Sequence, residues 1–341
     1  MPDRPLAEEG GDLVGAVPPV PLVTIGVPTY NRSATLERAL VSVLRQDYPA
    51  IEVIVSDNAS TDATAEVCQR LASQDRRVRY IRQPVNRGPT ANFVEVLHQA
   101  HGEYFMWLGD DDWLPDSSWV SECLSFLGAH PDHSLVCGIA RYFKGGHEFM
   151  GGTRLQLPQE SPLERVRAYY RVVDDNGTFY GLARRALLLE IGVTPALGGD
   201  WLLVAAIAFR GKIRTLGHIS ICRDHNWDER SYAKVVAIEG LTSISARFPF
   251  ASIGFSAFRE IVWRSLIYRN IPFLQRVLLG LQCQTIIVLR HGWPRAYRRL
   301  RAAAVGIVPH PVRTRLQRAL GRLRGDPDDD LGTGSGAAGR R

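Results

Sequence analysis

Between residues 22 and 110, short runs of apolar and β-branched residues alternate with segments whose apolar residues repeat at helical spacing. The runs predict strands at 22–27, 51–56, 78–82 and 104–108. In the first segment between strands, Leu36, Leu40 and Val43 share one helical face. This alternation is typical of β-α-β units. We therefore expect an α/β fold, with a mostly parallel central sheet flanked by helices and joined by right-handed crossovers.

Polar residues predict where the first helices begin. Asn31 and Ser33 stand where they could cap the first helix. The turn at 57–62 stands where its last residues could cap a second helix that extends to Leu71. A third helix is expected over 86–100.

The second half of the chain mixes both patterns. Helices are expected at 115–127, 162–171 and 200–209, strands at 134–140 and 213–222, and a glycine-rich loop at 145–158. From residue 241 the pattern is helical and is punctuated by prolines. These features predict a disordered tail over 1–21, an α/β domain over 22–240, a basic helical C-terminal extension over 241–324 and a second disordered tail over 325–341.

The cysteines and apolar stretches exclude several protein classes. Five cysteines lie far apart, with no CxxC pair and no Cys/His cluster at metal-ligand spacing, which argues against a disulfide scaffold, a zinc module and a redox motif. A reducing, cytoplasmic location is expected. The first 21 residues contain no signal-peptide pattern, and the stretch 277–289 is interrupted by Gln282 and Gln284. We therefore expect neither export nor a transmembrane helix.

The net charge of +6 is unevenly distributed. Between Arg259 and Arg324 there are fourteen arginines and one acid, Glu260. Arginine-rich amphipathic helices can lie on an anionic membrane, and they can equally form a solvated basic face packed on the rest of the protein. Peripheral contact with the inner face of the membrane through 259–324 is thus one hypothesis. No nucleic-acid partner is expected, because the arginines match no binding motif.

Segments rich in polar residues stand at the carboxyl ends of all four predicted strands. They are Pro28, Thr29, Tyr30 and Asn31 after the first, Asp57 and Asn58 after the second, Asn86 and Arg87 after the third, and Asp110, Asp111 and Asp112 after the fourth. The carboxyl ends of parallel strands meet at one edge, where ligands bind. Three adjacent aspartates repel one another unless a cation or hydrogen-bond donors offset their charge. A divalent ion such as Mg²⁺ or Mn²⁺ is commonly held by one or two carboxylates together with phosphate oxygens, so the pattern predicts a cation site for a pyrophosphate-bearing substrate.

Each of these residues also has an ordinary structural explanation. The acidic run can initiate a helix, Asp57 can be a turn residue, and Tyr30 can be a core aromatic. Their combination at one predicted edge favours a binding site. In such a site Asp57 would accept a hydrogen bond from a base N–H, and Tyr30 would stack on the base.

Five segments carry a family resemblance. They are IGVPTYNR at 25–32, SVLRQ at 42–46, VSDNASTD at 55–62, NRG at 86–88 and GEYFMWLGDDDWLP at 102–115. As an ordered set, they resemble the inverting GT-A glycosyltransferases of family 2. The resemblance implies a GT-A nucleotide-diphospho-sugar transferase fold, with a nucleotide-binding half at 22–115 and an acceptor half at 116–240.

The resemblance also implies roles for individual residues. Pro28, Tyr30 and Asp57 would hold the nucleotide base. The acidic motif would bind ribose and the metal-bound diphosphate, with Asp111 and Asp112 matching the two family aspartates and Asp112 in direct contact with the metal. Gly109 stands where many family members have Asp, so the part that Asp110 takes in binding the ribose and the diphosphate stays open.

The implied reaction is transfer of a hexosyl or deoxyhexosyl group, with inversion, from a nucleotide-sugar donor to a hydroxyl acceptor in cell-envelope glycan synthesis. Inversion requires a base that takes the proton of the acceptor hydroxyl. Asp200 is the candidate base, because the segment around it is similar to the family's acidic segment that opens a helix. The alternative role for Asp200 is to cap that helix. Many relatives have Glu-Asp where this chain has Gly199 and Asp200.

Two further segments are similar to family segments near the substrate. In one, His225 is a candidate metal ligand and Arg223 a candidate phosphate contact, although a lone histidine more often has a structural role. The other, residues 178–185 with Gly181, Arg184 and Arg185, either contacts sugar or phosphate or forms a solvated basic turn. A lipid-linked glycan is one hypothesis for the acceptor.

Two other functions stay open. A non-catalytic protein on a GT-A-like scaffold would keep the core without metal-dependent turnover. A sugar nucleotidyltransferase is expected to have a glycine-rich loop after the first strand, where this chain has Pro28, Thr29, Tyr30 and Asn31. A processive synthase is not expected, since the chain has no Gln-x-x-Arg-Trp signature.

Overall fold

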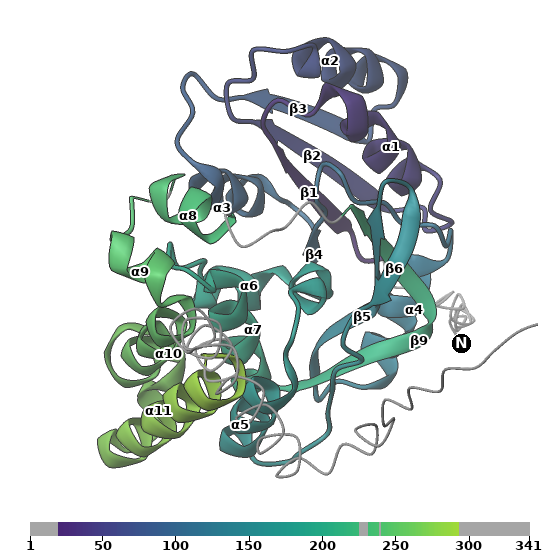
Figure 1. The fold of residues 1–341 in the computed structure, drawn as a ribbon. Coiled ribbons are helices and arrows are strands. Elements are labelled where there is room, and N and C mark those ends of the chain that lie inside the picture. The colour runs from purple at the N-terminus through teal and green to yellow at the C-terminus, as the bar shows by residue number, and fades with distance from the viewer. Residues whose placement is uncertain (1–19, 225–230, 239, 293–341) are drawn as a thin grey trace, which may run out of the picture. The chain divides into compact units, whose positions relative to one another are not determined.

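The computed structural model describes residues 20–224, 231–238 and 240–292. The chain divides into two compact units at Val288, and the following description concerns the first. Among the described residues, nine strands form one sheet in the order β3-β2-β1-β4-β8-β5-β9-β7, with β6 paired to β5 (Figure 1). The strands are β1 Val23–Thr29, β2 Ile51–Asp57, β3 Val78–Arg82, β4 Tyr104–Trp107, β5 His133–Lys144, β6 His147–Gly151, β7 Gln156–Leu157, β8 Leu182–Arg184 and β9 Lys212–Asp224.

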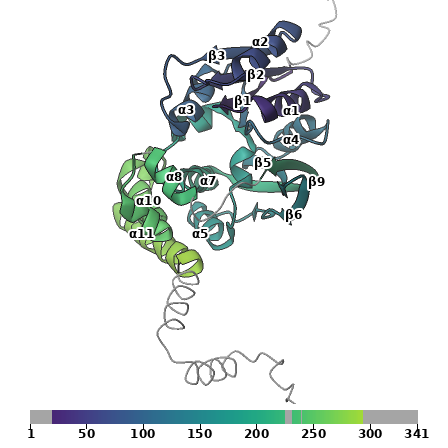
Figure 2. The ribbon, with the colours of Figure 1, turned by 45° about the horizontal axis from the view of Figure 1, so that its top comes forward.

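Helices cover the sheet and form the C-terminal part of the described chain. They are α1 Ser33–Leu44, α2 Thr64–Gln74, α3 Pro89–Gln99, α4 Trp119–Ala129, α5 Pro162–Val172, α6 Arg185–Ile191, α7 Gly199–Arg210, α8 Ser231–Ile238, α9 Ser243–Arg247, α10 Pro249–Arg259 and α11 Phe273–Ile287, with the short turns η1 Gly177–Tyr180, η2 Glu260–Arg264, η3 Leu266–Asn270 and η4 Val288–Gly292. Figure 2 shows α1 and α3 on opposite sides of the first strands. No helix within the described ranges is both long and apolar enough to cross a bilayer.

The predicted α/β architecture is confirmed. Strands β1 to β4 are parallel, and the four sequence-predicted strands coincide with them to within two residues. The register pairs Thr29 with Asp57, so the ends of β1 and β2 lie side by side. The second half joins the sheet through β8, which is antiparallel to both β4 and β5. The sheet therefore brings the ends of β1, β2 and β4 to one edge.

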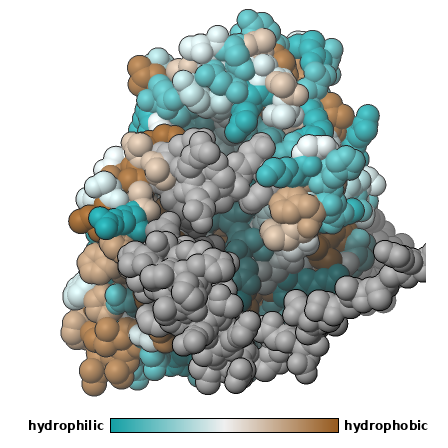
Figure 3. Space-filling view, viewed as in Figure 1, coloured by the Kyte–Doolittle hydropathy of each residue, from teal (hydrophilic) through white to brown (hydrophobic). Residues whose placement is uncertain are grey.

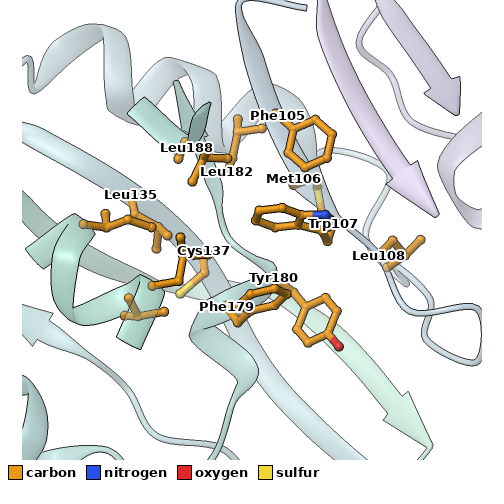
Figure 4. Close-up of a cluster of buried hydrophobic side chains, with 14 of the residues drawn as sticks. Phe105, Met106, Trp107, Leu108, Leu135, Cys137, Phe179, Tyr180, Leu182 and Leu188 are labelled. Atoms are coloured by element: carbon orange, nitrogen blue, oxygen red, sulfur yellow. The ribbon is translucent and has the colours of Figure 1, made fainter. Parts of the chain in front are cut away.

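An aromatic cluster fixes the second half of the chain against β4 (Figure 4). The rings of Trp107 and Phe179 stack with centroids 4.8 Å apart, and Trp107 Nε1 donates to the carbonyl of Phe93 over 3.0 Å. Such a ring pair contributes roughly 0.5–1.5 kcal/mol beyond the burial of its area. The cluster anchors η1 next to β4, whose following loop carries the acidic motif.

The structure corrects the expectation of a loop over 145–158. Residues in this stretch form β6 and β7 instead, because Gly145 and Gly146 adopt φ angles of +59° and +81° and close a two-residue hairpin turn between β5 and β6. The side chains of Arg141 and Glu148 form an ion pair across this hairpin. These two adjacent glycines therefore indicate a hairpin turn between two strands rather than an irregular loop.

One expected helix cap and one expected helix start are also wrong. Helix α1 has no side-chain cap from Asn31 or Ser33; its N-cap is Arg32, and the backbone N–H of Ser33 donates to Asp62. Helix α4 begins at Trp119 rather than residue 115, because Asp116 accepts bonds from the backbone N–H and hydroxyl of Ser220 in β9. In both places a carboxylate binds a distant segment of the chain.

The C-terminal helical pattern predicted from residue 241 is confirmed up to residue 292. The expected tails at 1–21 and 325–341 lie outside the described residues, apart from residues 20 and 21. The same holds for the part of the basic extension beyond residue 292.

Candidate active site

Asp57, at the end of β2, is fully buried. Its Oδ1 accepts from the backbone N–H of Ser60 over 2.8 Å, and its Oδ2 accepts from the hydroxyl of Tyr80 over 2.8 Å. Arg82 Nη1 lies 3.6 Å from the same Oδ2. Asp57 therefore holds the turn after β2 in place, and its contact with a nucleotide base stays a prediction.

The other predicted base contact, Tyr30, lies at the surface with 44% of its area exposed. Next to it, Asn31 has a φ of +54°, a left-handed conformation that Asn tolerates better than most residues. The Asn31 side chain accepts from the backbone N–H of Thr61 over 2.8 Å. Pro28 and Thr29 lie within β1 and are buried. The ring of Tyr30 is thus presented by an ordered turn.

Asn58 fixes the loop that carries Asn86 and Arg87. Its Nδ2 donates to Asn86 Oδ1 over 2.9 Å and to the carbonyl of Gly88 over 3.0 Å, and its Oδ1 accepts from the backbone N–H of Arg87 over 2.9 Å. The structure therefore brings the ends of β2 and β3 together as predicted. Arg87 itself points to solvent, 3.9 Å from Glu95.

Asp62 ties the first two helices to this edge. It accepts bonds from the backbone N–H and the hydroxyl of Ser33 in α1 and from the same groups of Thr64 in α2. Desolvation opposes the charged carboxylate, yet these hydrogen bonds outweigh it and lower the pKa of Asp62 to about 2.

The acidic motif follows β4 and lies next to the turn after β1. Arg32 Nε is 3.7 Å from Asp110 Oδ1, and Arg32 Nη2 is 3.9 Å from Asp111 Oδ2. Desolvation and the neighbouring charge of Asp111 raise the pKa of Asp110 to about 7, against the opposing influence of Thr29 and Arg32. The predicted meeting of the motif with the end of β1 is confirmed.

Asp112 lies deepest in the motif, with its side chain 1% exposed. Its Oδ2 accepts from Arg223 Nε over 2.9 Å, while its Oδ1 is buried without a hydrogen-bond partner. Desolvation raises the pKa of Asp112 to about 6, although the Arg223 charge opposes this. A Cβ on Gly109 would lie 2.7 Å from Asp112 Oδ2, so the carboxylate occupies the space that a side chain at 109 would need.

Arg223 and Asn176 link Asp112 to Asp200. Arg223 Nη1 donates to Asn176 Oδ1 over 2.6 Å, and the guanidinium lies 4.0 Å from the centre of the Tyr180 ring. The polar Asn176 side chain also lies near Asp200, the second residue of α7, and lowers the pKa of that carboxyl. We call this chain of four side chains the Asp112–Asp200 relay. It spans both halves of the sheet, since Asp112 follows β4 and Arg223 lies in β9.

The environment of Asp200 differs from that of a helix cap. The N-cap of α7 is Gly198, and no side chain caps the helix. Desolvation raises the pKa of Asp200, against the hydrogen bond from the backbone N–H of Trp201, the charge of Arg223 and the nearby polar side chain of Asn176. A carboxylate with a raised pKa is better suited to accept a proton than an ordinary surface aspartate.

The donor set of the acidic motif fits a magnesium or manganese ion. Asp112 Oδ1 is a buried acceptor without a partner, and Asp111 lies beside it. The described residues contain no group of three or more His, Cys, Asp or Glu side chains arranged to hold a metal. One or two carboxylates completed by water and phosphate oxygens are the usual protein share for Mg²⁺, so Asp112 and Asp111 would hold such an ion.

Two predicted contacts are not brought to this edge. Arg184 and Arg185 lie near the start of β4, at the end opposite the acidic motif: Arg184 pairs in register with Tyr104, and Arg185 Nε donates to the carbonyl of Gly102. Their candidate role in sugar or phosphate contact is therefore wrong. His225 lies outside the described residues. Arg223, expected at a phosphate, binds Asp112 and Asn176 instead.

Sequence comparison decides which family has this arrangement. Residues 24–192 match the sequence model of glycosyl transferase family 2. The chain belongs to this family. The match covers β1 to β4, the acidic motif and Asn176. The matched residues therefore include most of the side chains described above at this edge of the sheet.

Several family 2 relatives and solved structures are similar to the chain. The GalNAc(5)-diNAcBac-PP-undecaprenol beta-1,3-glucosyltransferase of Campylobacter jejuni is 42% identical over 175 residues, which are 50% of this chain and 53% of that protein. The abequosyltransferase RfbV of Salmonella typhimurium is 38% identical over 100 residues, 28% of this chain and 30% of its own. The chain spans about half or less of the length of these relatives.

The solved structures establish the fold. The mannosyltransferase PcManGT from Pyrobaculum calidifontis, in complex with GDP-Man and Mn²⁺, superposes with a TM-score of 0.54 at 19% identity, over 90% of this chain and 81% of that chain. TarS 1-349 from S. aureus, in complex with UDP-GlcNAc, superposes with a TM-score of 0.50 at 18% identity, over 80% and 92% of the two chains. The predicted GT-A fold is confirmed.

Sequence reasoning missed Asn176, included Tyr180 only within the segment 178–185 without a role of its own, and did not foresee that Asp62 binds both helices. One signal pointed to Asn176: it stands in a polar Asp-Asp-Asn-Gly turn between apolar segments. No local pattern indicated its hydrogen bond with Arg223 or its position near Asp200.

Proposed function

We propose that this chain transfers a sugar from a nucleotide-sugar donor to a hydroxyl acceptor, with inversion at the anomeric carbon and with Mg²⁺ or Mn²⁺ as cofactor. The observation that carries the proposal is the Asp112–Asp200 relay. It connects the carboxylate with the unpartnered oxygen to a carboxylate with a raised pKa. One site thus combines a group suited to a metal-bound diphosphate with a group suited to general-base catalysis.

The donor would lie along the edge formed by β1, β2 and β4. The exposed Tyr30 ring is available to stack on the nucleotide base, and Arg32 lies between this turn and the acidic motif. The mannosyltransferase and TarS structures were solved with GDP-Man and UDP-GlcNAc respectively, which supports a nucleotide-sugar donor of either base type.

Asp112 and Asp111 would hold the divalent ion, which neutralises the charge of the leaving diphosphate when bound. Arg223 keeps the buried Asp112 carboxylate ionised and fixes its orientation through Oδ2, so that Oδ1 remains available. Gly109 leaves room for this orientation.

Asp200 would take the proton of the acceptor hydroxyl as that oxygen attacks the anomeric carbon from the face opposite the diphosphate. The C–O bond to the acceptor forms as the bond to the diphosphate oxygen breaks, and the nucleoside diphosphate leaves. Asn176, whose side chain lies near Asp200, would help to orient it for this step. The printed name of the Campylobacter jejuni relative specifies a lipid-linked glycan, and we propose an acceptor of that class, used in cell-envelope glycan synthesis in the cytoplasm.

A thermal-shift screen of nucleotide sugars with Mn²⁺, followed by a donor-hydrolysis assay, tests this function. A donor that binds only the folded chain, present at a concentration about 100 times its dissociation constant, raises the free energy of unfolding by about 2.7 kcal/mol. This change gives a readily measured rise in Tm. We expect a Mn²⁺-dependent shift with at least one nucleotide sugar, and slow release of its nucleoside diphosphate. A chain that binds the donor but never releases the diphosphate with any acceptor would instead be a non-catalytic scaffold.

A further inference from the structure

Helix α11 exposes an apolar face. Leu274, Leu278 and Leu281 are 68%, 51% and 48% exposed, and their i, i+4, i+7 spacing places them on one face of the helix. The buried residues of the same helix, which include Cys283 and Ile287, lie on the other side, where α11 packs against α10 and α5. We call the three exposed leucines the α11 ridge.

The ridge belongs to a wider concentration of exposed apolar side chains. Eighteen large apolar side chains are exposed in the described part of the chain, and nine of them fall between residues 244 and 281. They include Trp263 and Phe273, each 54% exposed. Figure 3 shows apolar side chains gathered over α10 and α11. Contiguous exposed apolar surface of this kind usually marks an interaction site.

The segment that forms this surface has a net positive charge. Between residues 240 and 288 there are five arginines and one acid, Glu260. Arg269 is exposed, and the side chain of Arg264 is 48% exposed. We propose that the α11 ridge docks on the surface of an anionic phospholipid bilayer. Its leucines would enter the boundary between headgroups and acyl chains, and the neighbouring arginines would meet the lipid phosphates.

Charge complementarity favours this occupant over a second copy of the chain. Two copies facing each other through the ridge would each bring a net positive segment, and these segments would repel. The ridge is flanked by Gln275, Gln282 and Thr285, which offer no opposite charges to fix a helix pair. An anionic bilayer supplies the missing negative charge, and exposed tryptophans such as Trp263 are favoured at its interface.

The proposal does not depend on the proposed glycosyl transfer, because docking is measured without turnover. The test is co-sedimentation of the full chain with vesicles of phosphatidylcholine and phosphatidylglycerol in equal parts, and with vesicles of phosphatidylcholine alone. We expect binding to the anionic vesicles, little binding to the neutral ones, and weaker binding as salt is raised. No binding of the parent to the anionic vesicles would overturn the proposal.

A ridge variant and its matched control locate the contact. Leu274→Ser/Leu278→Ser/Leu281→Ser removes three apolar side chains and should weaken vesicle binding at least about tenfold. Val85→Ser/Phe149→Ser/Met150→Ser changes three similarly exposed apolar residues elsewhere and should bind as the parent does. Equal binding by the ridge variant and the parent would overturn the proposal, because another part of the chain would then make the contact.

Further measurements keep the result interpretable. Arg264→Gln/Arg269→Gln should weaken binding to anionic vesicles, whereas Arg45→Gln/Arg76→Gln, at exposed positions in the first half, should not. If the triple ridge variant melts below the parent, the single Leu278→Ser variant replaces it, with a smaller expected loss of vesicle binding.

Sedimentation equilibrium without lipid tests the alternative occupant, a second copy of the chain. We expect a monomer; a dimer that the ridge variant dissociates would overturn the proposal in favour of a second copy.

Discussion

Arg223 Nε donates to Asp112 Oδ2 over 2.9 Å, although the two residues are 111 positions apart in the sequence. This bond joins the end of β9 to the motif after β4. Since the Asp112 side chain is 1% exposed and that of Arg223 is 12% exposed, each residue is the main compensation for the other's buried charge. The first and second halves of the sheet are therefore coupled through this ion pair, in addition to the exposed pair of Arg38 with Asp224.

Removing Arg223 should be costly for folding. Arg223→Met leaves the Asp112 carboxylate buried without its partner, which should lower the free energy of unfolding by about 3–5 kcal/mol. Arg70→Met, which breaks an exposed pair with Glu37 at 2.7 Å, should cost less than about 1 kcal/mol. Urea unfolding measures both changes, and equal losses in the two variants would contradict the account of the buried pair.

Asn176 should act on the chemical step rather than on donor binding. Asn176→Ala removes the hydrogen bond from Arg223 and the amide near Asp200, and a misoriented base should lower kcat at least about tenfold with little change in the donor KM. The matched variant Asn270→Ala changes an exposed asparagine in η3 and should leave both constants unchanged. Steady-state kinetics separates the two parameters; a raised donor KM with unchanged kcat would assign Asn176 to donor binding instead.

Gly109 should control the orientation of Asp112. In Gly109→Ala the new Cβ would lie 2.7 Å from Asp112 Oδ2, so the carboxylate must turn and Mn²⁺ affinity should fall on the order of tenfold. Gly217→Ala is the control, because nothing lies within 4 Å of its Cβ position. Isothermal titration with MnCl₂, in the presence of the nucleoside diphosphate of the preferred donor, measures the affinity. Unchanged affinity in Gly109→Ala would remove Asp112 as the metal ligand.

Asp62 should stabilise the fold in a pH-dependent way. Its pKa of about 2 lies below the ordinary 3.8, so its contribution is fully present above about pH 4 and is lost as the pH falls towards 2. Asp62→Asn should lower the free energy of unfolding by about 1 kcal/mol at neutral pH, since it weakens solvent-screened, charge-assisted hydrogen bonds. Urea unfolding of both proteins should give curves that converge in acid. A difference that stays constant down to about pH 3 would show that the carboxylate charge is not the cause.

Local sequence patterns predicted the first half of the fold well. Buried β-branched runs and helical spacing are local properties, which is why β3 was predicted with its observed bounds, Val78–Arg82. The hairpin at Gly145 and Gly146 was missed because paired glycines were taken as loop residues without regard to the strands that they connect. The position of these two glycines between two strands, rather than the glycine content of the segment, determines that they form a hairpin turn.

The site was predicted in part. Asp57, Asp110 and Asp112 lie near β1 because the carboxyl ends of parallel strands meet at one edge of the sheet. The predicted strand ends alone were therefore enough to predict that these residues lie close together. The pairing of Arg223 with Asp112 and of Asn176 with Arg223 depends on β9 and on the turn before η1, and no local pattern encodes such contacts. The same limit explains why Arg184 was placed near the substrate, since β8 runs antiparallel to β4 and carries it to the other end.

The most direct test of the central claim is a comparison of Asp200→Asn with the parent on donor binding and on acceptor transfer. Asp47→Asn, an exposed aspartate outside the site, is the matched control. The account predicts that Asp200→Asn keeps the Mn²⁺-dependent thermal shift with the nucleotide sugar but transfers sugar at least about 100-fold more slowly, whereas Asp47→Asn behaves as the parent. Transfer by Asp200→Asn at the parent rate would contradict the account.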